Sequence, residues 1–240
     1  MSAPTPLPDV SNEPALTRLN RLAALDEAAQ SELNASLRRR RSAQARREVV
    51  AEGEVITEPL LILRGWAARV RVLPDGRRQL INFLLPGDLI GLCRHPDPCT
   101  ASTILAITDV QYCTAPRGAP DAPLGIAYAV SRAIEEAYLL SAITRLGRLN
   151  AQERLHDLFL EVLERMQLAG ITSDNSIPMP LTQEVLADAL GLTSVHVNRM
   201  IQLSRRQGHL VLAGGTLTIT DPDALGDMIG RSRVRIWGDC

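Results

Sequence analysis

Side chains whose hydrogen-bonding groups suit the edges of DNA bases lie close together near residue 200. Arg199 carries a guanidinium that can bond to two acceptors of guanine at once, and Asn198 carries an amide that can pair with adenine. On a helix, both would share an exposed face with Gln202, because residues three and four apart are neighbours on a helix surface. The spacing therefore predicts a helix that reads bases in the major groove of DNA.

The residues around this face have the spacing of a helix-turn-helix. Ala187 is small where two helices would cross, Gly191 permits a tight turn, and Val197 and Met200 face inward from the second helix. Thr193 can cap that helix. The predicted DNA-binding residues are Thr193, Ser194, Val195, His196, Asn198, Arg199, Gln202 and Arg205. An ordinary pair of packed helices is the alternative interpretation.

A hairpin follows the predicted reading helix. Two short apolar runs follow Leu210 and flank Gly214 and Gly215. In the second run Leu217 and Ile219 alternate with threonines, and this alternation is the period of a strand. A hairpin directly behind a recognition helix is typical of a winged helix, whose hydroxyls and amides contact the sugar-phosphate backbone. The alternative is a hairpin that only covers the core.

Composition limits the possible functions. The 240 residues, 45% of them hydrophobic, suffice for two modest domains or one large one. The net charge is −1, so contact with nucleic acid needs a local patch, for which Arg199, Arg205 and Arg206 are candidates. An aromatic content of 3% argues against stacking on single strands. Since a glycine-rich phosphate loop, a nucleophile elbow and an HExxH motif are missing, we expect no enzyme and no catalytic residues.

The compartment expected from the sequence is the cytoplasm. The first residues lack the basic and apolar parts of a signal peptide, and no run approaches the roughly 18 apolar residues of a membrane span. The cysteines, Cys93, Cys99, Cys113 and Cys240, form no CxxC pair, as is usual in a reducing compartment.

The first half of the chain predicts a tail, a helix and a small roll. Residues 1–14 have the composition of a flexible tail, and leucine spacing predicts a helix from Leu16 to about Arg41 that ends in the solvated basic run Arg38–Arg41. Short strands follow between about Val49 and Pro116, with a tight turn at Asp75-Gly76. We therefore expect a roll domain over residues 15–120.

A long helix over residues 121–149 carries apolar residues at alternating steps of four and three. They are Ile126, Val130, Ala133, Ala137 and Leu140. This pattern is typical of a coiled-coil dimer, although a helix buried on its own roll would show a similar stripe. A two-fold dimer would place two reading helices about 34 to 36 Å apart on a palindromic site. Residues 150–240 complete the predicted DNA-binding domain.

This order of elements resembles the Crp/Fnr superfamily of bacterial transcription regulators. Three segments carry the resemblance: DGRRQLINFLLPGDLIG (75–91), AQERLHDLFLEVLERM (151–166) and LTQEVLADALGLTSVHVNRM (181–200). The resemblance implies an α+β fold with a cyclic-nucleotide-binding-like β-roll, a long dimerisation helix and a C-terminal winged helix-turn-helix. It also implies a homodimer that binds palindromic double-stranded DNA and acts on RNA polymerase, with activation as the expected sign.

The resemblance also assigns residues. Arg199 matches the family's arginine that contacts guanine, and Asn198 occupies the neighbouring base-facing position. Many members carry a glutamate where this sequence has Val195, so we expect a different operator, with Val195 against a thymine methyl.

The effector residues of the family are missing. Cyclic-nucleotide-binding members have a glutamate after the GDxxG glycine and an arginine about ten residues later to clamp the phosphate. Here Leu92 follows Gly91, and Pro98-Cys99 stands near the arginine position, so cyclic AMP is not expected. No cysteine precedes Cys93, which excludes the N-terminal iron-sulfur cluster of other members. We expect no cofactor and an effector-independent regulator.

Two features of the sequence each allow more than one interpretation. Cys93, His95 and Cys99 could bind haem, a metal or an oxidant, which would make the protein a redox-, haem- or small-ligand-responsive regulator sensing through the roll. Alternatively, Cys93 and Cys113 pack as small strand residues and His95 lies at the surface. The C-terminal arginines, Arg231, Arg233 and Arg235, either contact phosphates or are solvated.

Overall fold

The computed structural model describes residues 13–93, 95 and 98–234. The N-terminal part contains α1 (Pro14–Leu22), α2 (Glu27–Leu37), β1 (Arg41–Ala43), β2 (Glu48–Val50), β3 (Leu60–Arg64), β4 (Ala67–Val72), β5 (Arg78–Leu84), β6 (Leu89–Ile90), β7 (Thr103–Ala106) and β8 (Val110–Thr114). The rest contains α3 (Pro123–Arg148), α4 (Ala151–Leu168), β9 (Ser176–Pro178), α5 (Gln183–Leu190), α6 (Ser194–Arg206), β10 (Leu210–Ala213), β11 (Thr216–Ile219) and α7 (Pro222–Met228). Of these helices, none is both long and apolar enough to cross a membrane.

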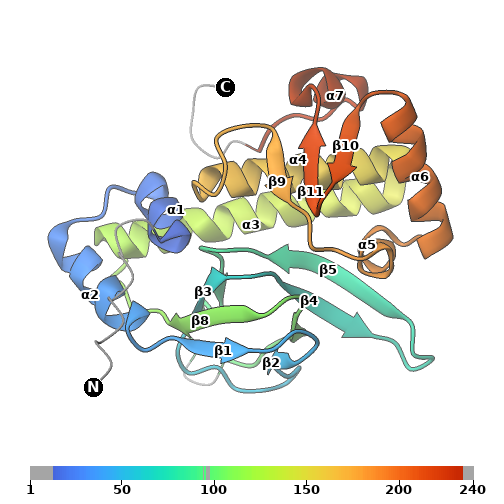
Figure 1. The fold of residues 1–240 in the computed structure, drawn as a ribbon. Helices are drawn as coiled ribbons and strands as arrows, with labels where there is room; N and C mark the ends of the chain where they lie inside the picture. The colour runs from blue at the N-terminus through green and yellow to red at the C-terminus, as the bar shows by residue number, and fades with distance from the viewer. Residues whose placement is uncertain (1–12, 94, 96–97, 235–240) are drawn as a thin grey trace, which may run out of the picture.

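The predicted roll is present, and the remaining elements are arranged around the long helix pair. The two antiparallel sheets of the roll have the strand orders β1-β8-β3-β6 and β2-β7-β4-β5. Buried residues of both sheets, among them Ile62 and Ile104, form its interior. Figure 1 shows α3 and α4 running between the roll strands and the C-terminal sheet. We call α4 to α7, with β9 to β11, the reading head.

The N-terminal segment differs from the single helix predicted up to Arg41. It contains two helices, because the side chain of Asp26 accepts a hydrogen bond from the backbone of Ala29 at 2.8 Å and starts a new helix. Arg41 already belongs to β1. The predicted tail is also too long, since Glu13 is buried and Pro14 begins α1; its residues 1–12 lie outside the described part of the chain.

The break between α3 and α4 falls at Asn150. The side chain of Asn150 accepts hydrogen bonds from the backbone of Gln152 and Glu153, and the Glu153 carboxylate accepts one from the backbone of Asn150 at 2.8 Å. This capping box satisfies donors at the start of α4 that would otherwise lack partners. The chain therefore turns sharply there, and α4 leads into the reading head.

One hydrophobic core is shared by the reading head and part of the roll. Val70 and Leu80 of the β4–β5 hairpin belong to the same buried cluster as Leu158, Leu186 and Val197 from α4, α5 and α6. Apolar area removed from water stabilises folding by about 25 cal/mol per Å². The orientation of the reading head on the roll therefore rests on packing as well as on the chain connection.

Candidate nucleic-acid interface

The helix-turn-helix forms as predicted, and each signal in the sequence has a local structural role. Gly191 ends α5 with φ 63°, a left-handed conformation that glycine adopts without strain. The hydroxyl of Thr193 accepts a hydrogen bond from the backbone of His196 at 3.2 Å and so caps α6. Ala187 is buried where α5 meets α6. The turn therefore positions the first residues of α6 at the molecular surface.

The two faces of α6 separate as the helical period predicts. Val197 and Met200 are buried, and Val195 is 78% exposed. Asn198, Arg199, Gln202 and Arg205 are exposed, Thr193 is exposed, and Ser194 and His196 are half-buried. All eight predicted DNA-binding residues therefore reach the surface, with Ser194 and His196 nearer its edge.

A residue of the preceding helix joins this face. Gln183, in the first turn of α5, donates a hydrogen bond from Nε2 to Oδ1 of Asn198 at 3.2 Å. The contact orients the Asn198 amide so that its NH₂ group remains directed away from Gln183. Gln183 is not among the predicted DNA-binding residues, although it directly follows Thr182, which caps α5.

The wing has one more strand than the sequence predicted. β10 and β11 pair antiparallel around Gly214 and Gly215, and β9 pairs with the other edge of β11. Leu217 and Ile219 are buried, and Thr216 at the hairpin end is exposed. Ile177 is buried in β9. The hairpin therefore both covers the core and presents a polar edge.

The C-terminal arginines fit neither alternative completely. Arg231 is half-buried, with its side chain only 7% exposed, and it forms ion pairs with Glu164 and, at 2.8 Å, with Asp157. Arg233 is exposed and lies 2.6 Å from a carboxylate oxygen of Asp223. Arg231 is therefore structural rather than solvated or available to phosphate. Arg235 and Cys240 lie outside the described residues.

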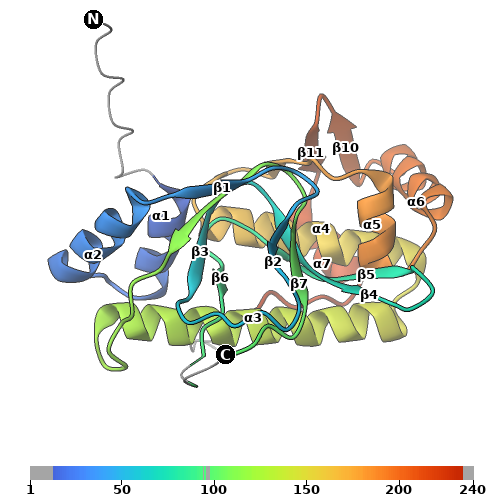
Figure 2. The same ribbon diagram turned by 90° about the horizontal axis from the view of Figure 1, so that it is seen from below.

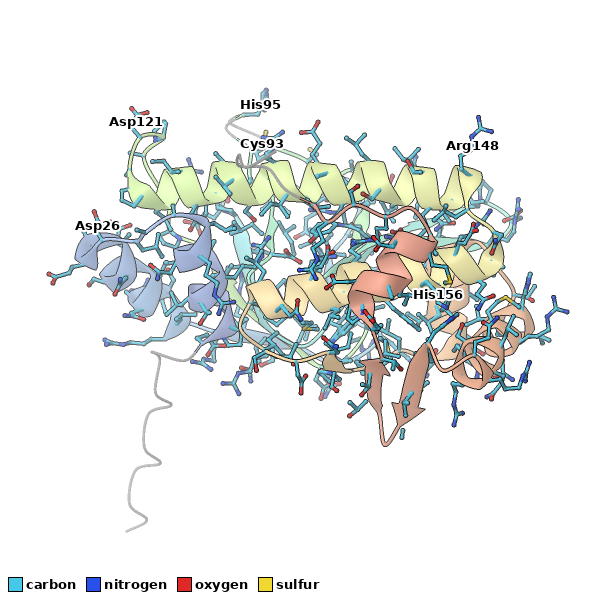
Figure 3. The ribbon with its side chains drawn as sticks, turned by 90° about the horizontal axis from the view of Figure 1, so that it is seen from above. Asp26, Cys93, His95, Asp121, Arg148 and His156 are labelled. Atoms are coloured by element: carbon cyan, nitrogen blue, oxygen red, sulfur yellow. The ribbon has the colours of Figure 1, made fainter. Side chains whose placement is uncertain are left out.

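The expected dimerisation stripe on α3 is only partly exposed in a single chain. Ile126 and Leu140 are 44% and 59% exposed, and Ala133 is also exposed, whereas Val130 and Ala137 are half-buried. Ile143, 68% exposed, extends the apolar face, as does exposed Ala129. The face runs along the helix between Asp121 and Arg148, which Figure 3 labels near its two ends. The exposed stripe therefore includes Ala129 and Ile143 in addition to Ile126, Ala133 and Leu140 of the predicted one.

The segment that carries Cys93, His95 and Cys99 follows β6 and begins beside the N-terminal half of α3. Figure 3 places Cys93 and His95 there, away from His156 inside the reading head. Cys93 and Cys99 are exposed, so the expectation that Cys93 packs as a strand residue is wrong: β6 ends at Ile90. Cys113 is buried, and burial raises the pKa of its thiol to about 11. Within the described ranges, no three His, Cys, Asp or Glu side chains group to hold a metal.

Two family models match two separate parts of the chain. The model of the cyclic nucleotide-binding domain matches residues 40–120, and that of the Crp-like helix-turn-helix domain matches residues 153–228. The nitrogen fixation regulation protein FixK of Bradyrhizobium diazoefficiens is 32% identical over 180 residues, which cover 72% of this chain and 75% of the relative. The chain belongs to the Crp/Fnr family of bacterial transcription regulators. This Crp/Fnr regulator is also 31% identical over 184 residues to the transcriptional activator protein FnrL of Cereibacter sphaeroides, with 72% and 73% coverage.

The fold of this Crp/Fnr regulator matches solved structures. FixK2 from Bradyrhizobium japonicum superposes with a TM-score of 0.67 at 24% identity, covering 82% of this chain and 98% of that one. The predicted architecture of β-roll, long helix and winged helix-turn-helix is confirmed. The molecule is a DNA-binding transcription regulator, and its family consists of regulators rather than enzymes.

Proposed function

We propose that this regulator binds a palindromic operator as a homodimer and activates transcription. The observation that carries the proposal is the outward face of α6, where Asn198, Arg199 and Gln202 are exposed beside Val195. Arginine and amide side chains on an exposed helix provide donors for guanine and a matched donor and acceptor for adenine. Val195 provides an apolar contact for a thymine methyl in place of a carboxylate. The operator therefore differs from one read by a glutamate at this position.

The exposed apolar face of α3 supports pairing of two chains. Ile126, Leu140 and Ile143 would remain in water in a monomer, whereas the same face of a second copy would bury them. A two-fold axis along α3 makes the interface self-complementary and gives the dimer two recognition helices. Two such helices suit half-sites about one helical turn apart.

The relatives support activation as the regulatory sign. FnrL of Cereibacter sphaeroides is named a transcriptional activator protein, and AadR of Rhodopseudomonas palustris a transcriptional activatory protein. An activator that binds upstream of a promoter needs a contact with RNA polymerase, which we propose as the protein partner of the operator-bound dimer.

We further propose that operator binding needs no small-molecule effector. Between the roll and α3, a cavity bounded by Asn82, Ile134 and Tyr138 measures about 10 Å³. A separate pocket of about 420 Å³ lies next to Leu92 and is lined by Arg117 and Arg132. The 10 Å³ cavity holds about one water molecule and is far below the roughly 300 Å³ of a small-ligand pocket, whereas the 420 Å³ pocket is large enough for one. The proposal therefore rests on the missing effector residues and not on volume. Buried Arg18, Asp88 and Arg165 complete the lining of the 10 Å³ cavity. Leu92, which follows Gly91, offers no group to bind a ribose or a phosphate.

The experiment that tests this function is selection of DNA fragments by the purified protein without added ligand. Sequencing of the bound pool should recover an inverted repeat whose half-sites lie about one helical turn apart. The absorption spectrum and metal content of the same sample should show no chromophore and no stoichiometric metal. A pool without any enriched sequence would contradict the proposal, and enrichment only from coloured or metal-containing protein would contradict effector independence.

A further inference from the structure

The β4–β5 hairpin of the roll extends to the end of the molecule where the recognition helix lies. Figures 1 and 2 show its tip and α6 at the same end in two perpendicular views. The turn at Asp75-Gly76 separates Val72 from Arg78, which are direct partners across the hairpin. The roll therefore places an exposed, arginine-containing turn beside the reading head.

Two polar contacts hold the hairpin against α5. Nε of Arg78 donates to Oδ2 of Asp188 at 2.7 Å, and the side-chain amide of Gln79 donates to the carbonyl of Ala189 at 3.5 Å. Val70 and Leu80, nearer the base of the hairpin, are buried in the core shared with the reading head. The position of the tip relative to α6 is therefore set by packing at its base and by the Arg78–Asp188 ion pair at its end.

A groove of about 800 Å³ separates the hairpin tip from the start of α6. Arg77 and Arg78 line one side, and Thr193 and His196 from the beginning of α6 line the other. Of the described residues lining the groove, Asp188 alone is acidic, and it is already paired with Arg78. The second cation of the groove lining, Arg77, is paired with Asp75, which is not among the lining residues.

Arg77 is free to exchange its present partner. It lies 2.8 Å from a carboxylate oxygen of Asp75, but the two side chains are 77% and 52% exposed. Exposed ion pairs contribute little, because water screens both charges. A phosphate offers the same guanidinium charge-assisted hydrogen bonds to two of its oxygens. Arg77 can thus turn from Asp75 to an anion at the mouth of the groove without breaking a buried contact.

We propose that the tip of the β4–β5 hairpin is a second contact with the operator backbone, with Arg77 binding a phosphate and the Arg78–Asp188 pair positioning it. The inference rests on the proposed function, in which α6 enters the major groove. The DNA strand that borders the major groove then passes the first turn of α6, where Thr193 and His196 lie. Arg77 faces this strand from the opposite side of the groove. The roll domain therefore takes part directly in DNA binding.

The test compares Arg77→Ala with Arg77→Lys and with Arg71→Ala as a matched control. Arg71 is an exposed arginine of the same hairpin, but it projects from the strand face opposite to Val72, which lines the groove. Each alanine variant removes one charge, so the overall field of the protein changes equally. Binding of a fluorescent operator obtained by selection is measured by anisotropy between about 50 and 200 mM salt, the range in which phosphate contacts dominate.

Arg77→Ala should weaken operator binding about 5-fold or more near physiological salt and make the slope of log K against log salt shallower by about 1 to 2. Arg77→Lys should keep most of the affinity, and Arg71→Ala should bind like the original protein. A single methylphosphonate that neutralises the contacted phosphate should weaken the original protein and leave Arg77→Ala unaffected. Equal behaviour of Arg77→Ala and the original protein, or an equal loss in Arg71→Ala, would overturn the inference. If the original protein bound no operator, the proposed function itself would fail.

Discussion

Arg165 on α4 and Asp88 in the turn before β6 form a buried ion pair that joins the reading head to the roll. The Arg165 guanidinium also donates to the carbonyl of Phe83 at 2.7 Å and to Glu161 at 2.9 Å. Asp88 lies 3.2 Å from Arg18 of α1 as well. Burial alone would raise the pKa of Asp88, but Arg165 and Arg18 outweigh it and hold the pKa below its usual value. Two helices, α1 and α4, therefore contact one ionised carboxylate of the roll.

Replacing Asp88 by alanine should destabilise the protein strongly. The variant leaves Arg165 and Arg18 buried without their shared anion, and loss of one partner of a buried ion pair typically costs about 3–5 kcal/mol. Asp223→Ala is the matched control, because its pair with Arg233 is exposed and should cost less than about 1 kcal/mol. Urea unfolding of both variants measures the difference, and similar midpoints would contradict the structural role of Asp88.

His156 should make the stability of the protein depend on pH below neutrality. Its ring is buried, Nε2 lies 2.7 Å from the hydroxyl of Ser204, and the ring of His209 packs edge-on at 5.4 Å. Burial, followed by the charge of His209, lowers the pKa of His156 to about 4. The unfolded chain therefore binds a proton near pH 6.5 that the folded protein excludes, and the free energy of unfolding falls as the pH drops from about 6.5 toward 4.

The slope from this one group is at most about 1.4 kcal/mol per pH unit. The contribution of His156 is measured by urea unfolding of the original protein and of His156→Gln at several pH values. Glutamine keeps a hydrogen-bonding amide but does not titrate. The difference between the two curves should be constant above about pH 7 and should change between pH 6.5 and 4. Parallel curves over the whole range would rule out His156 as the responsive group.

Arg199→Ala should weaken operator binding by about 1–3 kcal/mol and relax the preference at one base pair of each half-site. Arg206→Ala serves as the comparison, since Arg206 is exposed at the far end of α6, beyond the base-facing residues. A phosphate contact or a general charge effect lowers affinity uniformly over all sequences. Repeating the DNA selection with both variants separates these outcomes. Unchanged specificity in Arg199→Ala would refute the assigned base contact.

Ile143→Asp should convert the dimer into a monomer. Ile143 is 68% exposed in one chain, so the aspartate costs little in the monomer but places two charges in the apolar interface of a dimer. Val55→Asp, at another exposed apolar residue, should leave the dimer intact. Light scattering should give twice the 26.2 kDa chain mass for the control and one chain mass for Ile143→Asp. Identical masses for both variants would place the interface elsewhere.

The sequence by itself determined the recognition helix and which of its faces is buried. Val197 and Met200 alternate with Asn198 and Arg199 at helical spacing, and the cap at Thr193 acts within three residues of itself. Such signals depend on neighbours along the chain, so they are readable before folding. The wing was predictable for the same reason, because two short strands at period two surround a pair of glycines.

Only the tertiary structure decided which charges are buried and what they contact. Asp88 lies 77 residues from Arg165 along the chain, and Arg78 lies 110 residues from Asp188. Arg231, for which the sequence allowed either a phosphate contact or a solvated side chain, instead pairs with Asp157 and is half-buried. A charged residue has the same appearance in a sequence whether it faces water or a distant partner. Its environment is set by long-range packing of elements, which no local period encodes.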